Sequence, residues 1–281
     1  MKSQYKMLGI VTLFNPNEKE LTEKLEYYLH DIDHLIVWDN SPISHEDSFS
    51  LYKDIVTYHW TGENTCIAAA INFALEKAIK EGFDLLLLMD QDSRWENFHC
   101  YRQNIEHLYE TNPQQVFTPY IEGNDQFQIQ HDIEYKSLFI NSGTVFPVSI
   151  LQHIGGADEA LPLDALDHDL SYRIRAAGFP IICITKCILR HTIGQPKRKG
   201  PFNLFTNDYG RFRTYSITRG HIICYRKNRH IMTAYEVRKF YKEIFMWKMI
   251  RIILVEEDKW GRFCALCKGI RDGINYKIAH S

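Results

Sequence analysis

The sequence predicts an α/β protein built on a mostly parallel sheet and followed by a helical C-terminal region. In the first half, apolar runs of strand length alternate with amphipathic stretches of helix length, which is the pattern of βα units. The chain has 281 residues, of which 45% are hydrophobic and 24% are charged, so it can bury a sizeable core without disorder or a fibrous repeat. We expect an α/β domain over residues 1–205 and a helical extension over residues 206–281.

The individual elements follow from where the apolar runs begin and stop. Short apolar runs mark the strands, which we expect at 7–14, 34–39, 54–59, 83–89, 115–120, 127–131, 138–146 and 182–185. Amphipathic stretches with start and stop signals mark the helices, which we expect at 18–29, 65–80, 95–111 and 167–177. Asn64, just before the second helix, is a good N-cap candidate.

The N-terminus and the cysteines favour the cytoplasm. The first residues lack the apolar core and the small-residue cleavage site of a signal peptide, and fit a first strand better. Seven cysteines, an odd number, do not form a disulfide framework and are typical of a reducing compartment. Cys264 and Cys267 form a C-x-x-C pair with no second pair at zinc spacing, so we expect both to be core thiols on a helix.

Charge is distributed unevenly along the chain. Residues 1–185 carry 12 Lys and Arg against 28 Asp and Glu, whereas residues 186–230 carry 11 basic residues against a single acid, Asp208. This basic block is either a solvated face or the contact for an anionic partner such as a diphosphate, a phospholipid surface or nucleic acid. Because the acidic first domain would repel a nucleic-acid backbone, we expect no nucleic-acid partner.

The most apolar segment of the second half is residues 244–255. It contains 12 residues, including Lys248 and Arg251, and cannot span a bilayer, which needs about 20 apolar residues. Aromatic and basic residues alternate in and before it, so it either lies flat in a membrane interface or packs on the domain as an ordinary helix.

The strongest local signal is an apolar strand that ends in two carboxylates. Asp90 and Asp92 flank Gln91 at the end of the run over 83–89, which places them at the carboxyl edge of the sheet, where open α/β sheets bind ligands. Two such oxygens suit Mg²⁺ or Mn²⁺ bridging phosphates, although an acidic surface turn would have the same letters. A lone His is more often structural, but His191 could complete a metal site begun by this pair.

A second acidic cluster lies at the expected start of the helix over 167–177. It contains Asp164, Asp167 and Asp169, with His168 between the last two. The helix dipole stabilises charged carboxylates there, and the first backbone N–H groups are available to an anion. Capping would explain one acid but not three, so we expect a catalytic carboxylate that acts as a general base on a hydroxyl group.

Seven short stretches carry a family resemblance across roughly residues 7–195. They are TLFNP (12–16), VWDNS (37–41), the run from Asn64 to Asn72, MDQDS (89–93), INSGT (140–144), DALDHDLSYR (164–173) and RHTIG (190–194). As a set they resemble the family-2 glycosyltransferases of the GT-A fold, most closely their bacterial rhamnosyltransferase-like branch. The stretch KGIRDGINYK (268–277) is similar to the closing segment of such enzymes, which often sits against the membrane.

The resemblance implies roles for the matching residues. The nucleotide-sugar would be bound by Thr12, Asn15, Pro16, Asp39, Asn64, Asn72, Asp90 and Gln91, with Asp39 hydrogen-bonded to the base. Asp92 and His191 would hold the metal, Mg²⁺ or Mn²⁺, and Asp167 would be the catalytic base. The acceptor or the sugar would contact Asp164, His168, Asp169 and Asn141.

The implied activity is that of an inverting, metal-dependent hexosyltransferase. It would move a rhamnose-like sugar or another hexose from a nucleotide diphosphate-sugar to a saccharide or lipid-linked saccharide acceptor in cell-surface polysaccharide synthesis. The protein would be cytoplasmic and would contact the inner face of the cell membrane peripherally through its basic C-terminal half.

Two departures from the family pattern leave parts of this open. Leu166 stands where many relatives have the Glu of a Glu-Asp motif, and Thr65-Cys66-Ile67 replaces a Gly-containing turn, which concern acceptor binding and donor preference. The alternatives are a haloacid-dehalogenase-like phosphatase, a sugar nucleotidyltransferase and a non-catalytic sugar-nucleotide-binding module.

Overall fold

The computed structural model of the protein describes residues 4–123, 125, 127–161, 164–191, 197–199 and 204–278. Packing divides the chain into two compact units: unit 1 is Met1–Ala157 with Arg173–Thr192, and unit 2 is Asp158–Tyr172 with Ile193–Ser281. This division differs from the expected boundary at 205/206. Residues 158–172 belong with the C-terminal helices because Asp169 bonds to Asn228 and Ala165 contacts Gly220.

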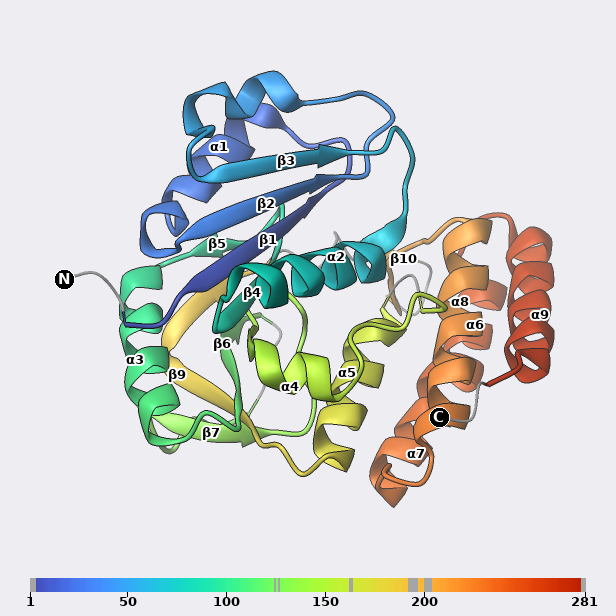
Figure 1. The fold of residues 1–281 in the computed structure, drawn as a ribbon. Helices are drawn as coiled ribbons and strands as arrows, with labels where there is room; N and C mark the ends of the chain where they lie inside the picture. Colours follow the sequence, from blue (N-terminus) through green and yellow to red (C-terminus); the bar gives the residue numbers. More distant parts are fainter. Residues whose placement is uncertain are drawn as a thin grey trace. The chain divides into compact units, whose positions relative to one another are not determined.

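Unit 1 is built on one mixed sheet of nine strands (Figure 1). The strands are β1 Met7–Leu13, β2 His34–Asp39, β3 Val56–Trp60, β4 Leu85–Asp90, β5 Arg94–Trp95, β6 Val116–Glu122, β7 Ile133–Lys136, β8 Val145–Pro147 and β9 Ile181–Arg190. Their order is β3-β2-β1-β4-β8-β6-β9-β5, with β7 also paired to β9. Strands β3, β2, β1 and β4 run parallel, so their carboxyl ends meet at one edge of the sheet.

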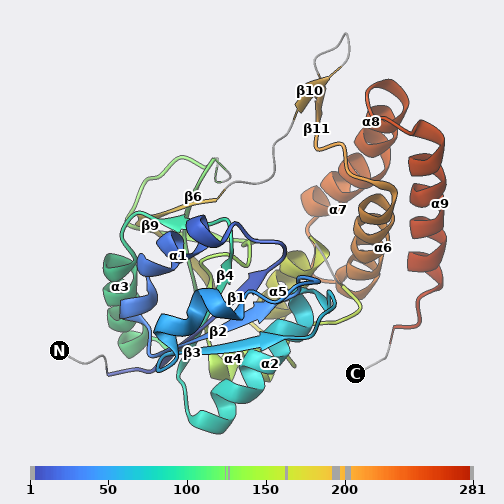
Figure 2. The same cartoon turned by 90° about the horizontal axis from the view of Figure 1, so that it is seen from above.

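Strands β1, β2 and β4 are apolar runs of the sequence because both of their faces are covered. The side chains of residues 85–89 in β4 are all buried, and those of β1 and β2 are nearly so. The covering helices are α1 Glu18–Glu26, α2 Cys66–Glu81, α3 Phe98–Thr111 and α4 Val148–His153, with short 3₁₀ turns at Leu29–Asp31 and Glu46–Tyr52. Helix α2 contacts β1 and β4, while α3 packs against β9 (Figures 1 and 2).

Most predicted elements are present, and the differences have local causes. The strand predicted over 127–131 is wrong, because these residues are irregular and the pairing with β9 is made by β7. The strand predicted over 138–146 is reduced to β8, since the chain turns at Gly143 with φ +80°. A side chain there would meet Pro119 and Leu189 at 2.8 Å.

The turn before α2 contains a residue in an uncommon conformation. Cys66 has φ +68°, a left-handed conformation that favours glycine. Asn64 was expected to cap the helix, but Thr65 occupies the N-cap position. The Asn64 side chain instead accepts a hydrogen bond from the Cys66 N–H at 2.9 Å, which closes the turn just before the helix.

Unit 2 contains the start of α5 and the C-terminal helices. Helix α5 is Ala165–Ala176, beginning two residues earlier than expected, and the unit boundary falls within it. The other elements are β10 Lys197–Lys199, β11 Leu204–Thr206, α6 Arg211–Asn228, α7 Ala234–Tyr241, a π-helical turn η3 Lys242–Trp247, α8 Lys248–Leu254 and α9 Lys259–Asn275. In η3, Phe245 contacts Phe240, five residues earlier, at a ring distance of 5.8 Å.

Helices α6 and α9 pack closely because α9 presents glycines to α6. A side chain at Gly269 would meet the Tyr215 carbonyl oxygen at 2.8 Å, and one at Gly273 would meet Ile222 at 2.9 Å. Cys264 and Cys267 lie on other faces of α9 and are exposed, so the prediction that they are core thiols was wrong. Within the described ranges, no helix has both the length and the apolar character to cross a membrane.

Candidate functional site

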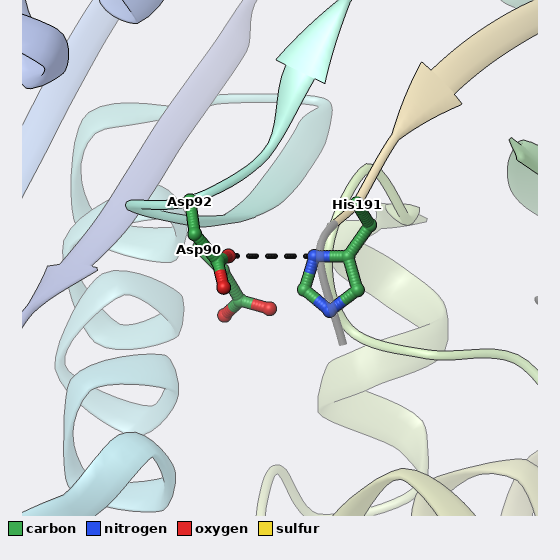
Figure 3. A group of neighbouring side chains, drawn as sticks. All are labelled: Asp90, Asp92 and His191. Carbon is green, nitrogen blue, oxygen red and sulfur yellow. Dashed lines mark ion pairs between the residues drawn. The ribbon is translucent and has the colours of Figure 1, made fainter. Parts of the chain in front are cut away.

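Three side chains with metal-binding atoms meet in unit 1. Asp90 ends β4, Asp92 follows two residues later, and His191 comes directly after β9 (Figure 3). Their candidate ligand atoms all lie within 4.8 Å of one another, and no other such group of His, Cys, Asp and Glu occurs among the described residues. Strands β4 and β9 belong to the same sheet, although β8 and β6 lie between them. The fold therefore brings together residues about a hundred positions apart in the sequence.

The electrostatics of this trio favour a cation. Burial raises the pKa of Asp90 to about 6; the charge of His191 lowers it and that of Asp92 raises it. For His191, burial lowers the pKa, but the hydrogen bond to Asp92 and the two carboxylate charges outweigh it, so the pKa is raised. The His191 Nδ1 lies 3.4 Å from Asp92 Oδ1. Two carboxylates and one imidazole form a donor set that suits Mg²⁺ or Mn²⁺.

Two buried serines orient the trio. The Ser93 hydroxyl lies 2.7 Å from His191 Nδ1 and 2.6 Å from the Ser142 hydroxyl, which also accepts a bond from the Asp90 N–H at 3.3 Å. Ser93 and Asp92 therefore fix the orientation of the imidazole beside the two carboxylates. Sequence reasoning did not single out these serines, although both stand in the stretches MDQDS and INSGT.

The loop after β1 is fixed beside this trio. Gln91 holds the Phe14 backbone by both amide atoms, accepting from its N–H at 2.8 Å and donating to its carbonyl at 3.1 Å. Asn15, at φ +46°, donates its backbone N–H to Ser41 Oγ at 2.8 Å. One edge of the sheet therefore contains five predicted nucleotide-binding residues, Thr12, Asn15, Pro16, Asp90 and Gln91. The Gln91 side chain itself holds the loop after β1.

Asp39 and Asn72 are already engaged by the protein. Asp39 is fully buried and accepts bonds from the Ser41 N–H at 2.9 Å, Tyr58 OH at 2.6 Å and His45 Nδ1 at 2.8 Å. Asn72 bonds to both backbone groups of Ala157, at 2.8 and 3.0 Å. The base contact of Asp39 and the sugar-phosphate contact of Asn72 stay predictions, and each would need these bonds to change. Asn64 is exposed.

The second acidic cluster belongs to unit 2. Asp167 is half-buried in the first turn of α5, and the exposed Asp164 lies 3.6 Å from Arg213. Asp169 is fully buried and accepts from Asn228 Nδ2 at 2.8 Å, with the Lys227 ammonium 3.3 Å away. This engagement gives Asp169 a packing role.

Two further predicted residues lie in apolar or turn surroundings. His168 packs on His221 with ring centroids 5.1 Å apart, and burial lowers the pKa of His168 to about 3, which keeps it neutral. Asn141, in unit 1, is buried in the turn before Gly143, where its carbonyl accepts the Thr144 N–H at 3.0 Å. Of the stretch RHTIG, Thr192, Ile193 and Gly194 lie outside the described residues.

Comparison with known proteins identifies the fold. No protein-family profile and no curated protein matches the sequence. A structure of GalNAc-T7 with UDP, GalNAc and Mn²⁺ superposes with a TM-score of 0.60 at 9% identity, covering 86% of this chain and 55% of that one. The chain has the GT-A fold. A structure of S. aureus TarS 1–349 with UDP superposes with a TM-score of 0.54 at 11% identity, covering 97% of this chain and 72% of that one.

These similarities confirm the predicted fold class and show nothing beyond the fold. The GT-A proteins in question are glycosyltransferases, and at 9% and 11% identity the similarity concerns the fold alone. The chain spans about half the length of GalNAc-T7, at 55%. The rhamnosyltransferase-like branch stays a prediction.

We expect Asp39→Asn to lower the free energy of unfolding at neutral pH by about 2 kcal/mol, because three donors lose a charged acceptor. Burial alone would raise the pKa of Asp39, but its hydrogen bonds lower it overall. Its contribution is therefore complete above the unfolded pKa, about 4, and is lost as the pH falls below that value. Urea unfolding at neutral pH and near pH 3 measures this, with the exposed Asp54→Asn as control. A difference that does not shrink at low pH would contradict the role.

We expect Asp92→Asn to weaken Mn²⁺ binding by at least about tenfold, since a charged ligand is lost from a three-ligand site. Titration of free Mn²⁺ by electron paramagnetic resonance measures the affinity. Asp47→Asn changes an exposed acid of the same unit and serves as the matched control. Equal loss in both variants would mean that the ion binds the acidic surface in general.

Proposed function

We propose that the protein is a metal-dependent glycosyltransferase that moves a sugar from a nucleotide diphosphate-sugar to an acceptor hydroxyl. The observation that carries the proposal is the trio of Asp90, Asp92 and His191 at the carboxyl edge of a GT-A sheet. The chemistry of the trio agrees with the bound groups of GalNAc-T7, whose structure holds UDP, GalNAc and Mn²⁺. TarS 1–349 was likewise solved with UDP.

Asp92 and His191 would hold Mg²⁺ or Mn²⁺, with Asp90 beside them. When bound, the ion would offset the charge that develops on the departing nucleoside diphosphate. The rest of the pocket would be formed by Thr12, Asn15 and Pro16, in a loop that Gln91 and Ser41 hold in place. A fixed loop lets the nucleotide bind without first ordering the backbone.

Asp167 is the proposed catalytic base. In the first turn of α5 its charged form is favoured by the helix dipole, as a base at neutral pH requires. The carboxylate would take the proton of the acceptor hydroxyl while that oxygen bonds to the anomeric carbon and the nucleoside diphosphate leaves from the opposite face. A single displacement of this kind inverts the configuration of the sugar. Asp164 would assist in acceptor binding.

The finer assignment rests on the sequence stretches. They favour a rhamnose-like sugar or another hexose as the group transferred, and a saccharide or lipid-linked saccharide of cell-surface polysaccharide synthesis as the acceptor. This places the enzyme in the cytoplasm at the inner face of the membrane. A GT-A sheet favours sugar transfer over the phosphatase alternative. A non-catalytic sugar-nucleotide-binding module would have the same fold, so only a measurement of turnover distinguishes it from an enzyme.

We expect Asp167→Asn to abolish sugar transfer while leaving donor affinity within about twofold, because the base acts on the acceptor and not on the nucleotide. The assay is nucleoside diphosphate release from a panel of nucleotide sugars with Mg²⁺ or Mn²⁺, with donor binding measured separately. Asp47→Asn, an exposed acid, should behave as the wild type. Full turnover in excess EDTA would refute the metal dependence, and parallel loss of donor binding in Asp167→Asn would refute the role of the base.

Peripheral membrane contact through unit 2 is supported by exposed apolar side chains. Phe212 on α6 is 77% exposed and Trp260 on α9 is 75% exposed, and an ion pair of Arg211 with Asp258 ties these two helix starts together. The exposed Lys259 adds positive charge beside Trp260. Apolar groups with cations suit an anionic lipid surface.

We expect Trp260→Ser to reduce cosedimentation with vesicles containing anionic lipid, because a large side chain can no longer enter the interface. The matched control is Tyr235→Ser, which removes an aromatic side chain of similar exposure, 73%, at the start of α7. If both variants sediment like the wild type, this surface does not bind the membrane.

A further inference from the structure

Two cationic side chains of unit 2 meet at one tyrosine ring. Tyr209 lies between β11 and α6, Arg213 is in the first turn of α6, and Lys248 begins α8. The Arg213 guanidinium carbon lies 4.2 Å from the centre of the Tyr209 ring, and the Lys248 ammonium lies 5.6 Å from it. The ring is attractive to both cations but carries no net charge to neutralise them.

Lys248 has no anionic partner within the described part of the chain. It makes no hydrogen bond or ion pair there, although it is partly buried. Burial lowers the pKa of Lys248, and the charge of Glu256 opposes this effect. Glu256 is itself engaged, because it accepts from Thr206 Oγ1 at 2.9 Å and pairs with Arg262 at 3.2 Å. Asp164 also acts on Lys248 by its charge, but neither carboxylate bonds to the ammonium. A partly desolvated ammonium with no bonded acid can take up an anion.

Arg213 is exposed, and its guanidinium lies against the same ring. Its one ion pair among the described residues is with Asp164, at 3.6 Å, and both side chains are exposed. An exposed pair at that distance contributes little to stability, so a phosphate could replace the carboxylate. A guanidinium offers two parallel N–H groups to phosphate oxygens, and a lysine adds a point charge.

We propose that Lys248 and Arg213, which both lie near the Tyr209 ring, bind a diphosphate group of the acceptor substrate. This rests on the proposed function, in which Asp167, three residues after Asp164 and in the same unit, activates the acceptor hydroxyl. The donor diphosphate is already assigned to Asp90, Asp92 and His191 of unit 1. A second diphosphate site therefore belongs to an acceptor whose saccharide is carried on a diphosphate, such as a lipid-linked one.

The affinity for a lipid diphosphate tests the site. Farnesyl diphosphate is the probe, and calorimetry gives its dissociation constant with the full-length protein. We expect Lys248→Met and Arg213→Met each to weaken binding by at least about tenfold, the effect of one charge-assisted contact. Lys53→Met removes an exposed lysine of unit 1 and should leave the affinity unchanged. Equal affinity in all variants would overturn the assignment.

A second readout locates the probe on the wild-type protein. Reductive methylation of Lys248, followed by peptide mass mapping, should be slowed by farnesyl diphosphate and not by farnesol, while methylation of the exposed Lys53 of unit 1 is unchanged. Protection of Lys248 by UDP or by inorganic pyrophosphate, with none by farnesyl diphosphate, would overturn the acceptor assignment. Urea unfolding of each variant shows whether it is folded.

The outcome can be separated from that of the proposed function. If the wild type releases no nucleoside diphosphate from any donor, the glycosyltransferase assignment fails, whatever the probe does. If the wild type turns over its donor but Lys248→Met and Arg213→Met keep the wild-type affinity for farnesyl diphosphate, the acceptor site fails and the enzyme assignment stands.

Discussion

The turn over residues 141–144 holds the end of β4, and the arrangement of the candidate metal ligands depends on it. Gly143 donates its N–H to Leu88 O at 2.8 Å, and Leu88 donates to Thr144 O at 2.9 Å. The Gly143 carbonyl in turn accepts the Tyr101 hydroxyl at 3.0 Å, from α3. Ser142 in this turn is bonded to Ser93, which in turn is bonded to the imidazole of His191. The turn that pairs with the end of β4 therefore also fixes the orientation of the imidazole.

The two units carry opposite local charge imbalances. In unit 1, two carboxylates, Asp90 and Asp92, lie beside the single imidazole of His191, and burial is the main cause that raises the pKa of Asp90. In unit 2, Lys248 is partly buried with no acid bonded to it within the described residues. In the proposed function, the trio of unit 1 would face the metal-bound nucleotide and the cations of unit 2 would face the anionic acceptor.

The sequence was a good guide where the physics is local. Runs such as Leu85–Met89 are apolar because both faces of a parallel strand are buried, so β1, β2 and β4 could be predicted from the positions of the apolar runs. Asp90 and Asp92 could be placed at the sheet edge for the same reason. The proximity of His191 was predicted from a resemblance and from donor chemistry, since periodicity says nothing about which residues meet at the ends of two strands that are not paired.

Sequence reasoning was weaker where one side chain has two uses. An amide such as Gln91 or Asn72, or a carboxylate such as Asp39, can bond a ligand or the protein backbone, and the letter is the same in both cases. Ser93 and Ser142 were missed because their hydroxyls act on each other across 49 positions. The unit boundary within α5 likewise depends on long-range partners of Asp169, which no local pattern encodes.

The π-helical turn η3 changes how the helical stretch from Ala234 to Leu254 can be used. An α-helix repeats its faces every 3.6 residues, but here Phe240 meets a residue five positions later. The wider turn offsets the angular phase of everything that follows, by roughly the 100° that one residue subtends. Phe240, whose ring stacks on Tyr225 of α6, and Lys248, whose ammonium lies near the Tyr209 ring, can thus take independent angles along one continuous helical stretch. Side chains of different chemistry can in this way share a single helical support without a loop between them.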